Sequence, residues 1–113
     1  MKSTTAIELI TFKLSTNIDN SQFLESNKTI THWLAKQNGY QSRYLSNNSE
    51  GLWSDLVLWE SMEAAEAASA QFMAAHAESD FMKCIDPDSV NMNHFNVQHS
   101  SHGLAKADSA DKI

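Results

Sequence analysis

Trp53-Ser54-Asp55-Leu56-Val57-Leu58-Trp59 is the stretch that decides the fold, because it alternates as a β-strand does. Successive strand side chains point to opposite faces, so Asp55 shares a face with both tryptophans. The other face is also mostly apolar. We therefore expect a central strand that is covered on both sides, with the Asp55 carboxylate removed from water between two indoles and in need of a partner.

The composition bounds the class of protein. A chain of 113 residues fits one domain with a modest core. Its formal net charge is -6 and its basic residues are scattered, which argues against nucleic acid or an anionic membrane as a partner. With no signal-peptide core and no apolar run of membrane-spanning length, we expect a cytoplasmic protein. Cys84 is the single cysteine, so we expect neither an internal disulfide nor a metal-binding cysteine pair.

Periodicity and capping signals divide the chain into strands and helices. Asp19 with Gln22 three residues later is typical of a helix start, Ser61 caps an alanine-rich helix, and Asp86-Pro87 ends a short one. We expect strands at 5–14, 40–46, 52–60 and 90 to about 98, and helices at 19 to about 37, from 61, and at 81–85. The domain thus spans 1–98, and the polar residues 99–113 are expected to form a disordered tail or a partner-dependent arm.

The order of these elements predicts an α+β, ferredoxin-like βαββαβ fold with a four-stranded antiparallel sheet and two helices on one face. Apolar residues occur on both faces of the strand at 5–14, so the face away from the helices needs a cover. We expect a second copy of the chain to supply it. The result would be a twofold homodimer in which two sheets meet.

Asp55 has a candidate partner on the preceding strand. If Leu45 lies opposite Trp53, then Arg43 lies opposite Asp55, since cross-strand partners advance in steps of two along one face. The pair could act as a catalytic acid and base. It could also be an ion pair that only fixes the strand register, and we favour this second interpretation.

His94 is the other titratable candidate in the expected sheet. It has the parity of Val90 and Met92, so we expect it to point into a buried layer. There it could be a proton shuttle or a ligand, or equally a core histidine bonded to Asp55 or to a backbone carbonyl. If Arg43, Asp55 and His94 converge, they form a polar cluster in an apolar layer.

The chain also resembles a known family over roughly residues 5–98. The matching runs are Glu8-Leu9-Ile10-Thr11-Phe12-Lys13-Leu14, Phe23-Leu24 with Asn27, Trp33-Leu34-Ala35 with Gly39, Ser42-Arg43-Tyr44-Leu45, Trp53 to Trp59, Phe81-Met82 with Ile85-Asp86-Pro87, and His94-Phe95. They resemble an uncharacterised subgroup of the dimeric α/β-barrel proteins grouped with the antibiotic-biosynthesis monooxygenases. That superfamily includes cofactorless quinone-forming oxygenases, haem-degrading monooxygenases and lactone isomerases.

The resemblance implies a pocket between sheet and helices. Quinone-forming members line it with Asn, Trp and Tyr, and these residue types recur as Asn27, Trp59 and Tyr44. Asn27 could orient a ligand, or it could cap a strand edge. Trp33 and Trp59 could form a substrate platform, although large aromatics more often belong to the core.

The haem-degrading members carry an Asn on the first strand and a Trp and a His on the second helical segment. Here the strand position is apolar or Thr and the Trp position falls near Ala68, so His76 is not carried over as a haem ligand. We expect no cofactor and no metal, and we keep haem binding as a third, weaker possibility.

The preferred interpretation is a cofactor-independent, monooxygenase-like enzyme acting on an aromatic or quinone-like compound. Asp55 or His94 would abstract a proton, and Asn27 or Arg43 would stabilise the oxyanion, after which the carbanion reacts with dioxygen. The alternative is a non-catalytic, ligand-binding or stress-associated dimer in which Arg43, Asp55 and His94 hold the sheet together. An open apolar cavity rimmed by these three groups favours the enzyme, and a closed, fully packed interior favours the alternative.

Overall fold

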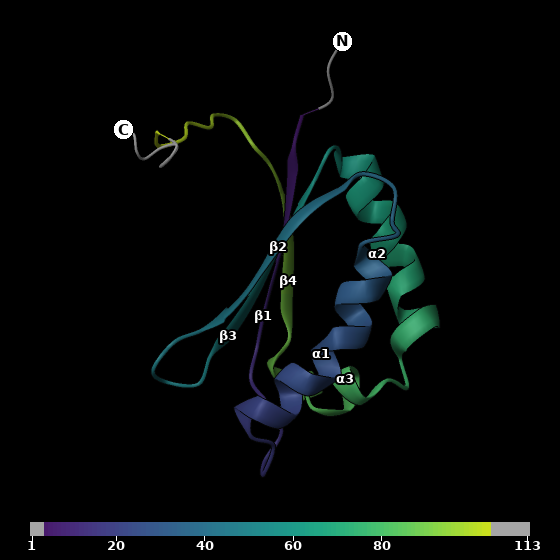
Figure 1. The fold of residues 1–113 in the computed structure, drawn as a ribbon, viewed down its shortest axis with the longest axis vertical. Helices are drawn as coiled ribbons and strands as arrows, with labels where there is room; N and C mark the ends of the chain where they lie inside the picture. Colours follow the sequence, from purple (N-terminus) through teal and green to yellow (C-terminus); the bar gives the residue numbers. More distant parts are fainter. Residues whose placement is uncertain (1–3, 105–113) are drawn as a thin grey trace.

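A four-stranded antiparallel sheet forms one layer of the molecule and the helices form the other (Figure 1). The computed structural model describes residues 4–104. The strands follow the order β2-β3-β1-β4. Their bounds are β1 (Ala6–Phe12), β2 (Tyr40–Asn47), β3 (Trp53–Trp59) and β4 (Asn91–Asn96). The helices are α1 (Asn20–Leu34), α2 (Met62–His76), α3 (Asp80–Lys83) and a 3-10 turn, η1 (Pro87–Ser89). The α+β, ferredoxin-like prediction is confirmed.

The helices begin at the expected caps. Asp19 Oδ1 accepts a hydrogen bond from the Gln22 amide at 2.8 Å, and Ser61 Oγ accepts one from the Ala64 amide at 3.1 Å. The first helix ends at Leu34 rather than near 37. After it the backbone tightens into i to i+3 hydrogen bonds, and Gly39, with a φ of +83°, turns the chain toward β2.

The register between β2 and β3 differs by two residues from the expected one. Leu45 lies opposite Asp55, and Asn47 rather than Leu45 lies opposite Trp53. Because side chains alternate with a period of two, this shift keeps Arg43 on the face of Asp55 and makes the pair diagonal instead of directly opposed.

The hairpin turn explains the shift. Asn48 Oδ1 accepts hydrogen bonds from the amides of Glu50 and Leu52 at 2.9 and 3.0 Å, and the Asn48 amide donates to Leu52 O. An asparagine that folds the loop onto its own side chain sets which residues face each other at the end of the hairpin. The side-chain turn at Asn48 therefore places Asn47 opposite Trp53.

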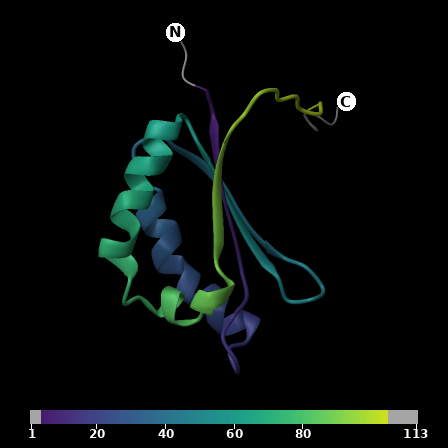
Figure 2. The ribbon, with the colours of Figure 1, turned by 180° about the vertical axis from the view of Figure 1, so that it is seen from behind.

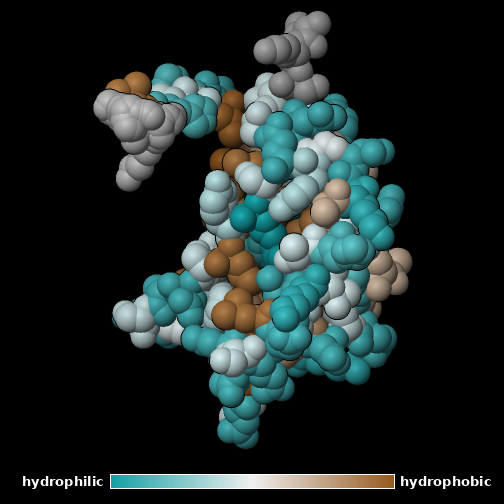
Figure 3. Space-filling view, viewed as in Figure 1, coloured by the Kyte–Doolittle hydropathy of each residue, from teal (hydrophilic) through white to brown (hydrophobic). Residues whose placement is uncertain are grey.

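The helices cover only one face of the sheet, as the view from behind also shows (Figure 2). Trp53, Asp55, Val57 and Trp59 are buried on that face, as expected for β3. On the opposite face the apolar side chains are only half-buried or are exposed, and Figure 3 shows apolar groups at the surface along the sheet. These are Ile7, Leu9, Leu56, Leu58, Tyr44 and Phe95. The expected cover for this face does not come from residues 4–104.

An aromatic cluster fills part of the space between sheet and helices. The ring of Phe23 lies 4.9 Å from those of Trp53 and Phe81 and 5.6 Å from that of Phe12, measured between centroids. Trp53 is thus a core residue.

The chain after β4 has no regular structure through residue 104, and residues 105–113 of the expected tail lie outside the described residues. Within residues 4–104 no helix combines the length and hydropathy needed to cross a bilayer.

Candidate functional site

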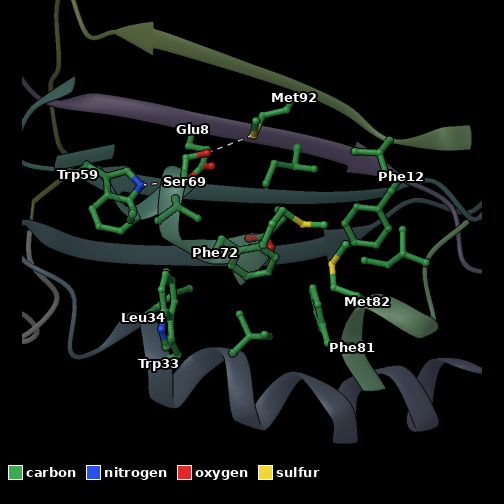
Figure 4. Close-up of a pocket in the computed structure, with 18 residues that line it drawn as sticks. Glu8, Phe12, Trp33, Leu34, Trp59, Ser69, Phe72, Phe81, Met82 and Met92 are labelled. Carbon is green, nitrogen blue, oxygen red and sulfur yellow. Dashed lines mark hydrogen bonds between the residues drawn. The ribbon is translucent and has the colours of Figure 1, made fainter. Parts of the chain in front are cut away.

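An apolar cavity of about 220 Å³ lies between the sheet and the helices (Figure 4). Its walls are aliphatic and aromatic side chains from both layers, and its only polar lining residues within the described chain are Glu8, Asp55 and Ser69. No lysine or arginine of residues 4–104 lines it. An apolar cavity of about 150 Å³ can hold benzene, so this one has room for a small aromatic ring system. The expected apolar cavity is present, but of Arg43, Asp55 and His94 only Asp55 lines it.

Arg43 and Asp55 form the predicted pair. Arg43 Nε donates to Asp55 Oδ1 and Arg43 Nη2 donates to Asp55 Oδ2, each at 2.9 Å. Both side chains are buried, with exposed fractions of 6% and 9%. Both carboxylate oxygens are therefore occupied by one guanidinium, in the bidentate geometry typical of strong pairs. Asp55 lines the cavity, but Arg43 does not.

Asn27 supports this pair from α1 and does not line the cavity. Its Oδ1 accepts a hydrogen bond from Arg43 Nη1 at 2.6 Å, and its Nδ2 donates to Thr31 Oγ1 at 3.3 Å. The network ties the first helix to the centre of the sheet. This geometry favours the structural interpretation of Arg43 and Asp55, since all the strong donors and acceptors face one another.

Glu8 on β1 is a buried carboxylate that the sequence reasoning did not single out. Glu8 is 8% exposed, and Trp59 Nε1 donates a hydrogen bond to Glu8 Oε1 at 3.2 Å. Burial raises the pKa of Glu8, and the positive charge of a protonated His94 partly opposes that rise. A signal was available, because Glu8 shares its strand parity with the apolar Ala6 and Phe12.

His94 pairs with Glu8 and not with Asp55. The two residues lie opposite each other across β1 and β4, and His94 Nε2 is 3.7 Å from Glu8 Oε2. Arg43, Asp55 and His94 therefore do not converge, so the condition for one polar cluster is not met. Two polar pairs occur instead, one between β2 and β3 and one between β1 and β4, because the strand order puts His94 at the far edge from Arg43.

The aromatic residues predicted to bind a ligand lie on both sides of the sheet. Trp33 and Trp59 line the cavity. Tyr44 was expected there too, but it lies opposite Leu56 on the uncovered face and is 61% exposed. The reason is alternation along β2: Arg43 takes the helix side, so its neighbour Tyr44 must take the other.

His76 is buried at the C-terminal end of α2. Its ring lies 5.0 Å from that of Trp33 and 5.1 Å from that of Phe72, and Nε2 has no hydrogen-bond partner within the described chain. Burial lowers the pKa of His76. Across residues 4–104, no cluster of three or more His, Cys, Asp or Glu side chains could hold a metal ion.

Sequence comparison alone finds no relatives: no protein-family profile matches the chain, and no curated protein does. The structure does have similar neighbours. SnoaB, a cofactor-independent oxygenase from Streptomyces nogalater, superposes with a TM-score of 0.70 and 14% identity, covering 87% of this chain and 97% of SnoaB. A proposed antibiotic biosynthesis monooxygenase from Nitrosomonas europaea gives 0.67 and 7%, covering 90% and 98%. The chain has the fold of the antibiotic-biosynthesis-monooxygenase-like α/β proteins.

A third neighbour with this monooxygenase-like fold is MhuD, a haem degrader from Mycobacterium tuberculosis. Its TM-score is 0.68 and its identity 16%, covering 86% of this chain and 99% of MhuD. The three neighbours share the fold but are named for different activities. A shared fold does not fix an activity, so the residues of the cavity are what distinguish this chain from its neighbours.

Proposed function

We propose that this chain is a cofactor-independent oxygenase that converts a small, neutral hydroxyaromatic compound into a quinone, with dioxygen as the oxidant. The observation that carries the proposal is the cavity of about 220 Å³, which is apolar except for two buried carboxylates and a serine. Such a site binds an uncharged ring and offers a proton acceptor to its hydroxyl group. The fold shared with SnoaB, a cofactor-independent oxygenase, supports the oxygenase class.

The chemistry can be written for 1-naphthol as the probe. A carboxylate takes the hydroxyl proton, and the ring carbon para to the oxygen then bonds to dioxygen, which becomes a hydroperoxide when the proton is returned. The carboxylate next takes the hydrogen on that ring carbon, the oxygen–oxygen bond breaks, and the hydroxide that leaves is protonated to water. One 1-naphthol and one dioxygen thus give one 1,4-naphthoquinone and one water.

The residues around the cavity contribute in distinct ways. Trp33 and Trp59 supply flat apolar surface for the ring. Asp55 presents a fixed polar group to the ligand. Arg43 holds the Asp55 carboxylate in place, and Asn27 holds the Arg43 guanidinium. The apolar walls exclude water, so an anion formed in the cavity interacts strongly with nearby dipoles.

The test measures dioxygen uptake and quinone absorbance with 1-naphthol and purified protein. Ala68 lines the cavity and Ala67 is exposed on the same helix, so Ala68→Leu fills the cavity and Ala67→Leu is a matched control. We expect Ala68→Leu to lower the rate at least about tenfold, the cost of misplacing a bound ring. No dioxygen uptake above buffer would overturn the proposal. Quenching of tryptophan fluorescence without uptake would instead support the non-catalytic ligand-binding alternative.

We also propose that a second copy of the chain covers the free sheet face. Leu9, Leu56 and Leu58 are only half-buried there, and Phe95 is 49% exposed. Soluble monomers rarely expose a large contiguous apolar patch to solvent. Light scattering should give the mass of a dimer for the wild type and of a monomer for Leu56→Glu. Thr29→Glu adds the same charge on an exposed part of α1 and should remain dimeric. A monomeric wild type would contradict this assignment.

Haem does not fit the described residues. The cavity is smaller than the range of about 300–1,000 Å³ typical of drug-sized ligands, and His76 packs between two rings outside its lining. When haem is added, we therefore expect no Soret shift that depends on His76. The wild type and His76→Ala should give the same spectrum.

A further inference from the structure

The two cavity carboxylates differ in what surrounds them. Asp55 has both oxygens bound by the Arg43 guanidinium, which leaves little capacity to take a proton. Glu8 accepts a hydrogen bond at Oε1 from Trp59, a neutral donor, and its Oε2 faces His94. In Figure 4, Glu8, Trp59 and Ser69 lie together on one side of the cavity, away from Phe12 and Phe81. This side is where a hydroxyl group of a bound ring would find an acceptor.

His94 connects Glu8 to the edge of the sheet. It lies on the edge strand β4, and its side chain is 22% exposed, against 10% for Glu8. Its Nε2 is buried without a hydrogen-bond partner in the described chain, 3.7 Å from Glu8 Oε2. A hydrogen bond needs about 2.7–3.2 Å, so a shift of less than about 1 Å would close it. The imidazole is thus placed to respond to the charge on Glu8.

We propose that Glu8 is the catalytic base of this cavity and that His94 is the positioning residue that stabilises its ionised form. The proposal rests on the proposed function for the identity of the reaction. Glu8 would take the hydroxyl proton of the substrate, return it to the peroxide oxygen, and repeat the exchange for the ring hydrogen and the departing hydroxide. No proton leaves the site over the whole cycle.

The charged and polar groups around Glu8 agree with this assignment. His94 approaches it from β4 and Asp55 from β3, Trp59 donates a hydrogen bond to it as a neutral group, and Ser69 of α2 lies beside it. Burial raises the pKa of Glu8, with Asp55 adding to the rise and His94 opposing it. A base whose pKa moves toward the working pH transfers protons more effectively than an ordinary glutamate. Removing His94 removes the main charge that opposes the rise.

The first experiment follows the pH dependence of kcat/KM for 1-naphthol. Glu8→Gln keeps the acceptor for Trp59 and should lower kcat/KM by about 10²–10⁴-fold, the range for losing a general base. Glu8→Asp should recover part of that loss. His94→Gln should keep activity at high pH. It should move the acidic limb of the pH profile to higher pH. Glu66→Gln, an exposed glutamate on α2, is the control and should leave both rate and profile unchanged.

The second experiment separates this proposal from the proposed function because it needs no dioxygen. 1-Naphthol is a photoacid, so its emission shifts to that of naphtholate when a nearby base accepts its proton in the excited state. Under nitrogen, ligand bound to the wild type should show naphtholate emission that Glu8→Gln abolishes. Absence of oxidation with this emission intact would reject the oxygenase and keep Glu8 as the base. Loss of the emission in Asp55→Asn but not in Glu8→Gln would overturn the proposal, as would an unshifted acidic limb in His94→Gln.

Discussion

Replacing Arg43 by methionine should be one of the most destabilising single changes in this chain. The guanidinium makes two hydrogen bonds of 2.9 Å to Asp55 and one of 2.6 Å to Asn27, with only 6% of its side chain exposed. Removing one partner of a buried ion pair typically costs about 3–5 kcal/mol, because the remaining charge loses its compensation. A domain of this size unfolds at a cost of about 5–15 kcal/mol, so the loss is a large share of the total.

The measurement is the free energy of unfolding in urea for Arg43→Met, Asp55→Leu and the double variant. Protein concentration must be held fixed, since association would add to the apparent stability. We expect the double variant to lie within about 1 kcal/mol of the wild type, because two apolar side chains can replace a buried pair at little cost. The structural interpretation of this pair would be refuted if Arg43→Met cost less than about 1 kcal/mol, or if the two single losses simply added in the double variant.

Three further changes test other parts of the structure. Because burial raises the pKa of Glu8, the Glu8 carboxyl stays protonated in the folded protein at pH values where it is already ionised in the unfolded chain. The stability of the fold therefore decreases as the pH rises through the pKa that Glu8 has in the folded protein. Glu8→Gln should therefore melt at a higher temperature than the wild type at neutral pH, and the gain should vanish below about pH 4, near the ordinary glutamate value. An equal gain at both pH values would contradict this. Burial lowers the pKa of His76, so its contribution is complete above about pH 6.5 and is lost as pH falls through the folded pKa. His76→Phe should show a smaller fall in melting temperature between pH 7 and pH 5, and an unchanged fall would exclude His76 as the cause. Gly39 and Gly51 both have a φ of +83°, but a Cβ at Gly39 would meet Ala64 Cβ at 2.6 Å, whereas one at Gly51 has nothing within 4 Å. Denaturant unfolding of Gly51→Ala should show a loss of about 1–2 kcal/mol, and Gly39→Ala about 1–3 kcal/mol more, so equal losses would rule out the clash.

Local signals were sufficient to predict the elements of this fold. The alternation of residues 53–59 and the caps at Asp19 and Ser61 depend on side chains within a few positions of each other, and the structure confirms each. The hairpin register was missed because it depends on which side-chain turn Asn48 makes, and a five-residue loop permits several. The end of α1 was misjudged for a similar reason, since its last turn tightens before Gly39.

The candidate site was harder to predict because its pairs span the whole sheet. Glu8 and His94 are far apart in sequence, and only the pairing of β1 with β4 brings them together. Arg43 and Asp55 lie on adjacent strands of one hairpin, so their contact could be predicted even with the wrong register. The position of Tyr44 was within reach of the sequence, because neighbours along a strand cannot both face the same layer.

The strand order also separates the parts of the cavity that must stay constant from those that can change. Glu8 and Asp55 stand on β1 and β3, the inner strands, whose backbones are paired on both sides. Met73, Val90 and Met92 belong to α2 and to the chain at the sheet edge, and they are 53%, 44% and 47% exposed. Directed evolution toward larger or differently substituted rings should therefore begin at these three positions. In the proposed reaction, substrate range would then be set by these exposed side chains and proton transfer by the inner strands.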